Sequence, residues 1–311
     1  MQTVAVLIPC FNEGLSIARV VREFRAQLPE ATVYVYDNNS TDDTASEARS
    51  AGAVVRTEHR QGKGYVIQSM FKDIHADIYV LVDGDGTYPA DRVRDLIHPI
   101  AEGTADMTIG SRLHPLSNSR FKYLNLTGNR LFLFLVNTLF RMRISDLLSG
   151  YRALSRHAVK SLPVLSKGFE VEAELTIKCL ERGYRVLEIP VNLATRQEGS
   201  TSKIHIVKDG VRILNTIFSL TRDFKPLTVF GLIGIVVLLC GLAAGCAALA
   251  ASFPADGIQR LLLSFLAGGL ILSALLSFSV GLILHSLARR FQEQNHLLQN
   301  LPRSEPNDRR H

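Results

Sequence analysis

The N-terminal part of the chain alternates short apolar runs with segments whose apolar residues recur at helical spacing. The apolar runs cover residues 3–9, 31–37, 53–57 and 76–82, and each is short enough to form a strand. The segment between the first two runs has the spacing of an amphipathic helix, with apolar residues at Ile17, Val20, Val21, Phe24 and Leu28. This β-α-β-α order predicts an α/β fold with a mostly parallel sheet and helices on both of its faces.

Two long apolar runs follow nearer the C-terminus. No residue between Leu227 and Ser252 is charged, and between Leu261 and His285 the only titratable group is the final histidine. A helix needs about 20 apolar residues to cross the core of a bilayer, and each run is longer than that. The alternative is a pair of buried core helices, but two such runs in succession favour a transmembrane helical hairpin.

The charges that flank these runs predict their orientation. Arg222 and Lys225 precede the first run and Arg289 and Arg290 follow the second, whereas the loop at 253–260 carries one acidic and one basic residue. Basic flanks remain on the cytoplasmic side, and the N-terminus shows no basic-then-apolar leader. We therefore expect a multi-pass protein of the cytoplasmic (inner) membrane whose N-terminal domain lies in the cytosol.

Two further segments, 121–143 and 204–224, have an apolar side with cations at its margins. Such stripes usually pack against a protein core, but the second continues directly into an apolar run, which favours helices that lie in the membrane interface. The predicted organisation has four parts: a cytosolic domain at 1–203, an interfacial helix at 204–225, the hairpin at 226–288 and a polar cytoplasmic tail at 289–311.

Composition narrows the function class. The net charge of +6 could indicate a nucleic-acid partner, but the chain has no basic stripe interleaved with aromatic residues. An anionic membrane surface explains the basic excess more simply. The cysteines are scattered without a paired motif, so neither a zinc site nor a disulfide framework is expected; they are Cys10, Cys179, Cys240 and Cys246.

Polar side chains gather where three of the predicted strands end. The motifs are PCFNEG at 9–14, DNNSTDD at 37–43 and DGDGTYP at 83–89. Each alone could be an ordinary turn, because turns favour the same residue types. Ligands of parallel sheets bind beyond the carboxyl ends of the strands, so the three motifs together predict a binding crevice at one edge of the sheet.

Asp83 and Asp85 are the most informative pair in this set. They stand one residue apart at a strand end, and Gly84 and Gly86 permit an unusual backbone path there. Both carboxylates can then approach one hard cation such as Mg²⁺ or Mn²⁺, which completes its coordination with water and substrate phosphates. The pair therefore predicts a metal site that serves a nucleoside diphosphate.

The ordered motifs resemble those of a known family. IPCFNEG, DNNSTDDT, GKG, DGDGTYP, GSR and SGYR, followed by two apolar runs, are similar to the family 2 glycosyltransferases, and among them to the polyprenyl-phosphate glycosyltransferases related to dolichol-phosphate mannose synthase. This resemblance covers essentially the whole chain. It implies a GT-A (Rossmann-like) fold, a divalent metal and an inverting transfer of a sugar from a nucleotide sugar to a lipid phosphate.

The same resemblance assigns residues to the donor and the metal. It implies metal ligation by Asp83 and Asp85. The donor pocket that it implies comprises Pro9, Asn12, Glu13, Asp37, Asn39, Lys63, Asp83 and Gly84. The chain departs from the family pattern at Asn38, where an Asp-Asp pair is usual, and this bears on how the base of the nucleotide is read.

Cations between the metal motif and the apolar runs are candidates for the acceptor phosphate, because arginine forks match phosphate oxygens. The set is Arg112, Arg120, Lys122, Arg130, Arg152 and Lys203. We favour Arg112, Arg152 and Lys203, which stand in family motifs beside glycine or serine. Arg130, like Arg141 and Arg143, could equally contact lipid headgroups.

These candidates predict a mechanism without a dedicated base. A phosphomonoester has a second pKa near about 6 and is already nucleophilic at neutral pH. Departure of the nucleoside diphosphate needs help, which the metal on Asp83 and Asp85 and the cation of Lys203 would supply. Arg112 and Arg152 would position the attacking phosphate. The predicted catalytic set is therefore Asp85, Arg112, Arg152 and Lys203.

Several alternatives remain open from the sequence. Glu170 and Glu174 share one helical face and could be surface ion-pair partners or could contact the sugar or the basic site; the role of Glu172 is open as well. The chain could instead elongate a polysaccharide, or bind nucleotide sugars without catalysis as a membrane-tethered regulator. Neither uridine nor guanosine donors are excluded, and relatives suggest a homo-oligomer packed through the apolar runs.

Overall fold

The computed structural model describes residues 2–113, 123–195, 206–250 and 257–300. The chain divides into two compact units, Met1–Ile217 and Phe218–His311. This division falls within a helix rather than at either end of it. The candidate site belongs to the first unit, and the apolar hairpin belongs to the second.

The first unit is built on a seven-stranded sheet in the order β3-β2-β1-β4-β6-β5-β7. All strand pairings are parallel except the two that β6 makes with β4 and β5. The prediction of a mostly parallel α/β sheet is therefore confirmed. The strands are β1 Val4–Cys10, β2 Thr32–Asp37, β3 Val54–Thr57, β4 Ile78–Leu81, β5 Met107–Ser111, β6 Arg152–Ser155 and β7 Val186–Pro190.

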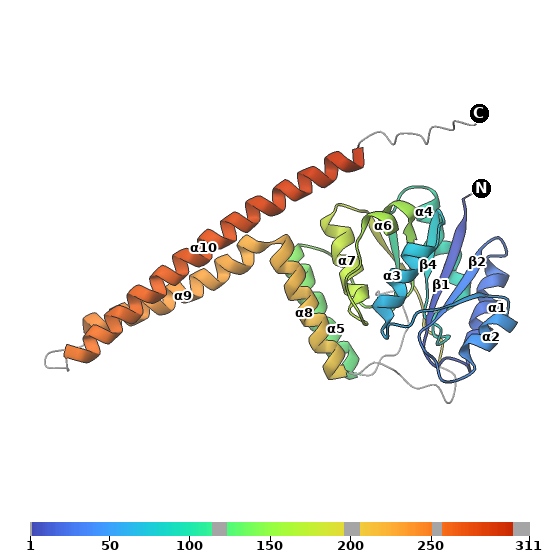
Figure 1. Cartoon of the computed structure of the whole chain (residues 1–311), viewed down its shortest axis with the longest axis horizontal. Helices are drawn as coiled ribbons and strands as arrows, with labels where there is room; N and C mark the ends of the chain where they lie inside the picture. The colour runs from blue at the N-terminus through green and yellow to red at the C-terminus, as the bar shows by residue number, and fades with distance from the viewer. Residues whose placement is uncertain (1, 114–122, 196–205, 251–256, 301–311) are drawn as a thin grey trace. The chain divides into compact units, whose positions relative to one another are not determined.

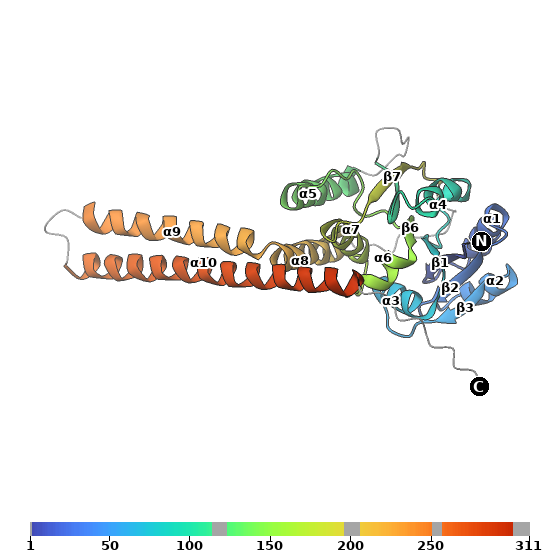
Figure 2. The same cartoon turned by 90° about the horizontal axis from the view of Figure 1, so that it is seen from above.

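Helices cover both faces of this sheet. One face packs against α1 Ile17–Gln27, α2 Thr44–Ser50, the short 3₁₀ helix η1 Ala90–Arg92 and α4 Val93–Ala101. The other packs against α3 Lys63–Asp73, α6 Arg156–Ser161 and α7 Val171–Glu181. Figures 1 and 2 show the two helical layers on either side of the strands.

The period-two pattern of the strands accounts for the two cores. Along β1, Val6 and Ile8 face the layer of α1, whereas Ala5 and Leu7 face the layer of α3. All four side chains are almost fully buried, which is why the strand reads as a continuous apolar run. Burial of a leucine or isoleucine side chain stabilises the fold by about 1.5–3 kcal/mol.

Two longer helices complete the first unit, α5 Tyr123–Phe140 and α8 Ile206–Phe224, the second of which runs across the division between the units. The expected single apolar stripe on α8 is in fact divided between two sides. Ile213 and Ile217 are buried, whereas Val207 and Val211 are 79% and 52% exposed. On α5, Phe134 is likewise 64% exposed. Both helices therefore keep apolar side chains outward after packing, as an interfacial helix does.

The second unit contains α9 Pro226–Ala250 and α10 Gly257–Asn300, which lie side by side (Figure 2). Their close approach depends on glycine, because a Cβ on Gly234 would lie 2.9 Å from the ring of Phe278. The hydroxyl of Ser277 donates across to the carbonyl oxygen of Phe230 at 2.7 Å. Both helices are long and apolar enough to cross a membrane, and only 17% and 11% of their most apolar windows are buried in the structure. Such exposure does not fit a pair of buried core helices.

Candidate active site

The carboxyl ends of β2, β1 and β4 are neighbours in the sheet, and this brings the three polar motifs together. The backbone N–H of Asn12 donates to Ser40 Oγ at 2.8 Å, and the Asn12 side chain accepts from the N–H of Thr41 at 2.7 Å. Ser16 Oγ donates to the carbonyl oxygen of Gly84 at 2.7 Å. The edge of the sheet is thus cross-linked between all three strand ends, at the positions where the motifs predicted a crevice.

Lys63 joins the metal motif to a residue from a distant part of the chain. Its ammonium lies 2.5 Å from Asp83 Oδ1 and 2.5 Å from Glu172 Oε1. Burial alone would lower the pKa of Lys63, but the two carboxylates outweigh it and raise that pKa. Burial also raises the pKa of Glu172. One ammonium is thus held between two carboxylates, and we call Lys63, Asp83 and Glu172 the rim cluster.

Packing leaves α3 little freedom in how it presents Lys63. A Cβ on Gly62 would lie 2.2 Å from the carbonyl oxygen of Lys167, and a Cβ on Gly64 would lie 2.1 Å from that of Ser166. The N–H of Gly64 donates to the Lys167 carbonyl at 3.1 Å. The GKG motif therefore needs both glycines because the loop before α7 runs directly against it.

Asp83 and Asp85 differ in their surroundings. A Cβ on Gly150 would lie 2.6 Å from Asp83 Oδ2, so the glycine of SGYR adjoins this carboxylate. Asp85 is 8% exposed and accepts from the backbone N–H and the hydroxyl of Thr87, at 3.0 and 2.7 Å. Among the described residues no group of three His, Cys, Asp or Glu side chains is placed to hold a metal. Two carboxylates at a rim are nonetheless the donor set that fits Mg²⁺ or Mn²⁺ when phosphates supply further ligands.

Arg112 engages a protein carboxylate. Its Nε and Nη2 donate to Asp146 at 2.8 and 2.9 Å, and its backbone N–H donates to the same carboxylate at 3.0 Å. Burial would lower the pKa of Arg112, but Tyr88 and Asp146 raise it. The backbone N–H groups of Ser145 and Asp146 donate to Glu188, which fixes the loop. The predicted fork on a lipid phosphate would therefore have to compete with Asp146.

Arg152 lies in the interior of the first unit rather than at the edge of the sheet. Only 1% of the residue is exposed. The guanidinium donates to the carbonyl oxygens of Ser149 and Leu147 at 2.8 and 2.9 Å, and to Thr176 Oγ1 at 2.7 Å. Burial lowers its pKa. These contacts tie the loop before β6 to α7, and they argue against the predicted contact with a lipid phosphate.

The structure places the remaining acceptor candidates less completely. Arg130 is exposed on α5. Arg120, Lys122 and Lys203 lie outside the described residues.

On the donor side, Asp37 is buried at the end of β2 and Asn39 adopts φ +62° beside it. Pro9 pairs with Tyr36 in the sheet register, and Glu13 is held by the bond from its N–H to Thr44 Oγ1 at 2.8 Å.

The three glutamates of α7 and its N-terminus have different roles. Glu174 is buried and bonds to Lys178 at 2.5 Å and to the N–H of Ser166 at 2.7 Å, so it supports the loop before α7. Glu170 Oε1 accepts from two N–H groups of the same loop. Glu172, whose role the sequence left open, is the one that reaches Lys63. The i, i+4 spacing predicts a shared helical face for Glu170 and Glu174, but no local pattern predicts the contact of Glu172 with Lys63 on α3.

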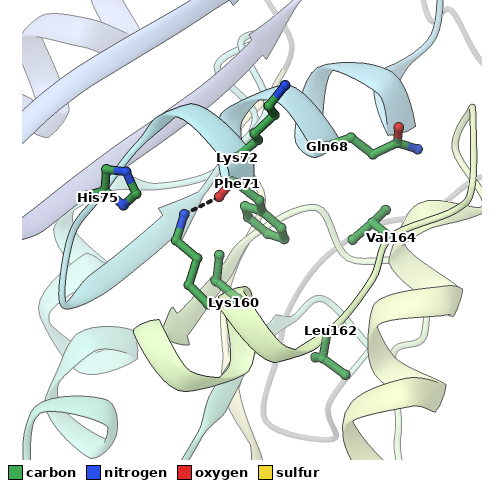
Figure 3. Close-up of a pocket in the computed structure, with 8 residues that line it drawn as sticks. Gln68, Phe71, Lys72, His75, Lys160, Leu162 and Val164 are labelled. Atoms are coloured by element: carbon green, nitrogen blue, oxygen red, sulfur yellow. Dashed lines mark hydrogen bonds between the residues drawn. The ribbon is translucent and has the colours of Figure 1, made fainter. Parts of the chain in front are cut away.

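A hollow of about 510 Å³ lies elsewhere on the domain. It is lined by the second half of α3 and by α6, including Lys72, His75 and Lys160 (Figure 3). The ammonium of Lys160 donates there to the carbonyl oxygens of Phe71 and Ile74. Lys63 stands at the opposite end of α3, so this hollow is separate from the rim cluster.

The chain is similar to known proteins over most of its length. The family described as glycosyl transferase family 2 matches residues 5–162. Glycosyltransferase AglJ of Haloferax volcanii is 33% identical over 77% of this chain and 78% of its own length. An undecaprenyl-phosphate mannosyltransferase of Micrococcus luteus is 25% identical over 64% of this chain and 86% of its own.

The fold also matches solved structures. Glucosyl-3-phosphoglycerate synthase of Mycobacterium tuberculosis, in complex with Mn²⁺, UDP-glucose and phosphoglyceric acid, superimposes with a TM-score of 0.60. The match covers 71% of this chain and 80% of that one, at 22% identity. At this identity the likeness supports the fold of the first unit and carries no assignment of substrate.

Proposed function

Because the chain belongs to the family 2 glycosyltransferases, an enzyme class that uses nucleotide sugars, we propose that it transfers a sugar from a UDP- or GDP-sugar to a membrane polyprenyl phosphate with inversion at the anomeric carbon. The observation that carries the proposal is the rim cluster beside Asp85 in a chain that also has two span-length apolar helices. The acceptor would be undecaprenyl or dolichyl phosphate, and the product would serve cell-envelope glycan or glycolipid modification.

In this proposal the donor lies along the edge formed by β1, β2 and β4. Asp83 and Asp85 would hold Mg²⁺ or Mn²⁺, which when bound neutralises charge on the departing nucleoside diphosphate. Lys63 is poised to move from Asp83 toward a donor phosphate, since Glu172 retains it from the other side. Asp37, Asn39, Asn12 and Glu13 would line the nucleoside end.

The acceptor oxygen needs no base, because a phosphomonoester is largely ionised at neutral pH. Arg112 at the rim and Lys203 are the proposed contacts of its phosphate, with Arg120, Lys122 and Arg130 as outer cations. Arg152 is left out because it is enclosed by carbonyl oxygens. The cations would position the phosphate for in-line attack and stabilise the charge of the transition state.

The membrane part of the proposal rests on the two apolar helices and on the outward side chains of α5 and α8. We place α9 and α10 across the cytoplasmic membrane, the first unit in the cytosol, and α5 and α8 in the headgroup layer. The named activity of the Micrococcus luteus relative supports a polyprenyl phosphate acceptor. Pairing of the spans between copies would give the homo-oligomer.

Transfer can be tested with purified full-length protein, radiolabelled UDP- and GDP-sugars, Mn²⁺ and undecaprenyl phosphate in bilayers. We expect label in the organic phase only when both acceptor and donor are present, and an anomeric configuration opposite to that of the donor. Label that stays in the aqueous phase with every lipid acceptor, while free nucleoside diphosphate accumulates, would contradict the acceptor assignment.

The metal site has a separate test. We expect Asp85→Ala to lower the transfer rate about 10²- to 10³-fold, and to abolish the gain in UDP affinity that Mn²⁺ produces in calorimetry without acceptor. The unfolding temperature should change less than the transfer rate, because Asp85 stands at the edge of the sheet and accepts hydrogen bonds from Thr87 in its own turn. A variant that still shows Mn²⁺-dependent UDP binding would remove Asp85 from the ligand set.

A further inference from the structure

Asn38 stands where the family pattern has the second acid of an Asp-Asp pair, and it is buried at the end of β2. Only 3% of it is exposed. Its Nδ2 donates to the carbonyl oxygens of Glu58 and Arg60 at 2.8 and 2.9 Å. Its Oδ1 accepts from the N–H of Gly62 at 2.7 Å and from Gln61 Nε2 at 3.3 Å. These bonds use both N–H groups and both lone pairs of the amide, so Asn38 does not read a base directly.

All four hydrogen-bond partners of the Asn38 side chain belong to residues 58–62, which connect β3 to the first residue of α3. This loop has one tight path, because Gly62 adopts φ +139° and has no room for a Cβ against Lys167. Glu58 and Arg60 form a two-bonded pair within the loop, and this lowers the pKa of Glu58 to about 2. The position of Lys63 therefore depends on a loop that the side chain of Asn38 holds in place by hydrogen bonds.

We infer that Asn38 is a positioning residue for the donor nucleotide: by holding loop 58–62 it sets the wall beside Asp37 and the start of the helix that carries Lys63. The inference rests on the proposed donor site. An aspartate at this position would lose both N–H donors and turn a carboxylate oxygen toward the carbonyls of Glu58 and Arg60. A buried carboxylate oxygen that faces two carbonyl oxygens and no donor is unfavourable, so the loop would move or the carboxyl would take up a proton.

The test measures UDP and GDP binding by calorimetry on the full chain in nanodiscs, with Mn²⁺ and without lipid acceptor. For whichever nucleotide the wild type binds, we expect Asn38→Asp to weaken binding about tenfold or more near pH 7.5. Binding should recover partly toward pH 5.5, at about which the protonated carboxyl regains one O–H donor. Asn38→Ala, which removes the bonds without adding charge, should weaken binding about threefold to tenfold.

Thr32→Asp is the matched control. It adds the same charge at the exposed start of β2, at the opposite end of the strand that leads to Asn38, where water solvates it, and it should change nucleotide affinity less than about twofold. Amide hydrogen exchange over residues 58–64 should accelerate in both Asn38 variants and remain at the wild-type rate in the control. The exchange rate measures how readily the loop opens, and it can be measured without any ligand.

Unchanged nucleotide affinity in Asn38→Ala, or unchanged exchange over the loop, overturns the inference. An equal loss of affinity in Thr32→Asp also overturns it, because the effect would then belong to charge alone. If the wild type binds UDP or GDP but transfers no sugar to polyprenyl phosphate, the proposed acceptor is wrong and the role of Asn38 stands.

Discussion

The first unit buries two cations in opposite ways. The ammonium of Lys63 lies between the carboxylates of Asp83 and Glu172, at the edge of the sheet. The guanidinium of Arg152 lies in the interior among carbonyl oxygens and a hydroxyl. In the proposed function, a donor phosphate or a metal would rearrange the ion pairs that Lys63 makes with these carboxylates. Neutral dipoles hold Arg152 in a fixed geometry that suits a scaffold.

The difference shows why a cation beside a glycine in a family motif is not by itself a phosphate ligand. In SGYR the glycine adjoins Asp83 at the rim, while the guanidinium of the arginine two residues later is buried against the carbonyl oxygens of Ser149 and Leu147. Gly150 of this motif therefore leaves room for Asp83 at the site, whereas Arg152 of the same motif stabilises the fold.

The largest expected effect comes from removing the rim cation. Lys63→Met leaves Asp83 and Glu172 without their shared partner, and we expect the transfer rate to fall about 10²- to 10³-fold. Lys178→Met is the matched control, since Lys178 also pairs with a buried glutamate at 2.5 Å but stands on α7 away from the rim. Both variants should lose stability in thermal unfolding. Equal loss of turnover per folded molecule in the two variants would contradict a special role for the rim cluster.

A smaller loss is expected when Asp83 is displaced without a change of charge. In Gly150→Ala the new Cβ would lie 2.6 Å from Asp83 Oδ2, so the carboxylate must shift, and we expect turnover to fall about tenfold. Gly128→Ala on α5 meets no atom within 4 Å and should leave turnover unchanged. Steady-state rates at saturating donor distinguish the two variants. Wild-type turnover in Gly150→Ala would mean that Asp83 need not be held in place.

Arg152→Lys should affect stability and leave the chemistry intact. A lysine keeps the charge but cannot reach two carbonyl oxygens and Thr176 together, and we expect a loss of about 2–4 kcal/mol in the free energy of unfolding. The Michaelis constants for donor and lipid acceptor should stay within about twofold once activity is expressed per folded molecule. A strongly raised constant for the lipid acceptor with unchanged stability would return Arg152 to the acceptor site.

The smallest effect concerns the pH dependence of stability. Burial raises the pKa of Glu172 in the native state, so its native contribution is fully present below the unfolded pKa of about 4.3 and declines as the pH rises through the raised value. Glu172→Gln cannot ionise. Its unfolding temperature should therefore decline less than that of the wild type between about pH 4 and pH 7. Parallel curves for the two proteins would show that Glu172 ionises as easily when folded as when unfolded.

The first four strands could be predicted because their apolar runs are short, begin and end at turn residues and alternate with amphipathic segments. The convergence of the motifs at 9–14, 37–43 and 83–89 followed from parallel order alone, since parallel strands end at one edge. The two apolar helices could also be predicted, because a long run of uncharged apolar residues is enough to identify a helix of span length.

Contacts between distant segments were decided by the tertiary structure. Glu172 meets Lys63 only because α7 and α3 pack on the same face of the sheet. Arg152 is buried because β6 lies between β4 and β5 and runs antiparallel to both. No local sequence pattern predicts this placement. Asn38 differs from aspartate by one group in the sequence, but its role depends on two carbonyl oxygens about twenty residues away. Periodicity reports which face a residue occupies, whereas charge pairing depends on which elements the fold brings against that face.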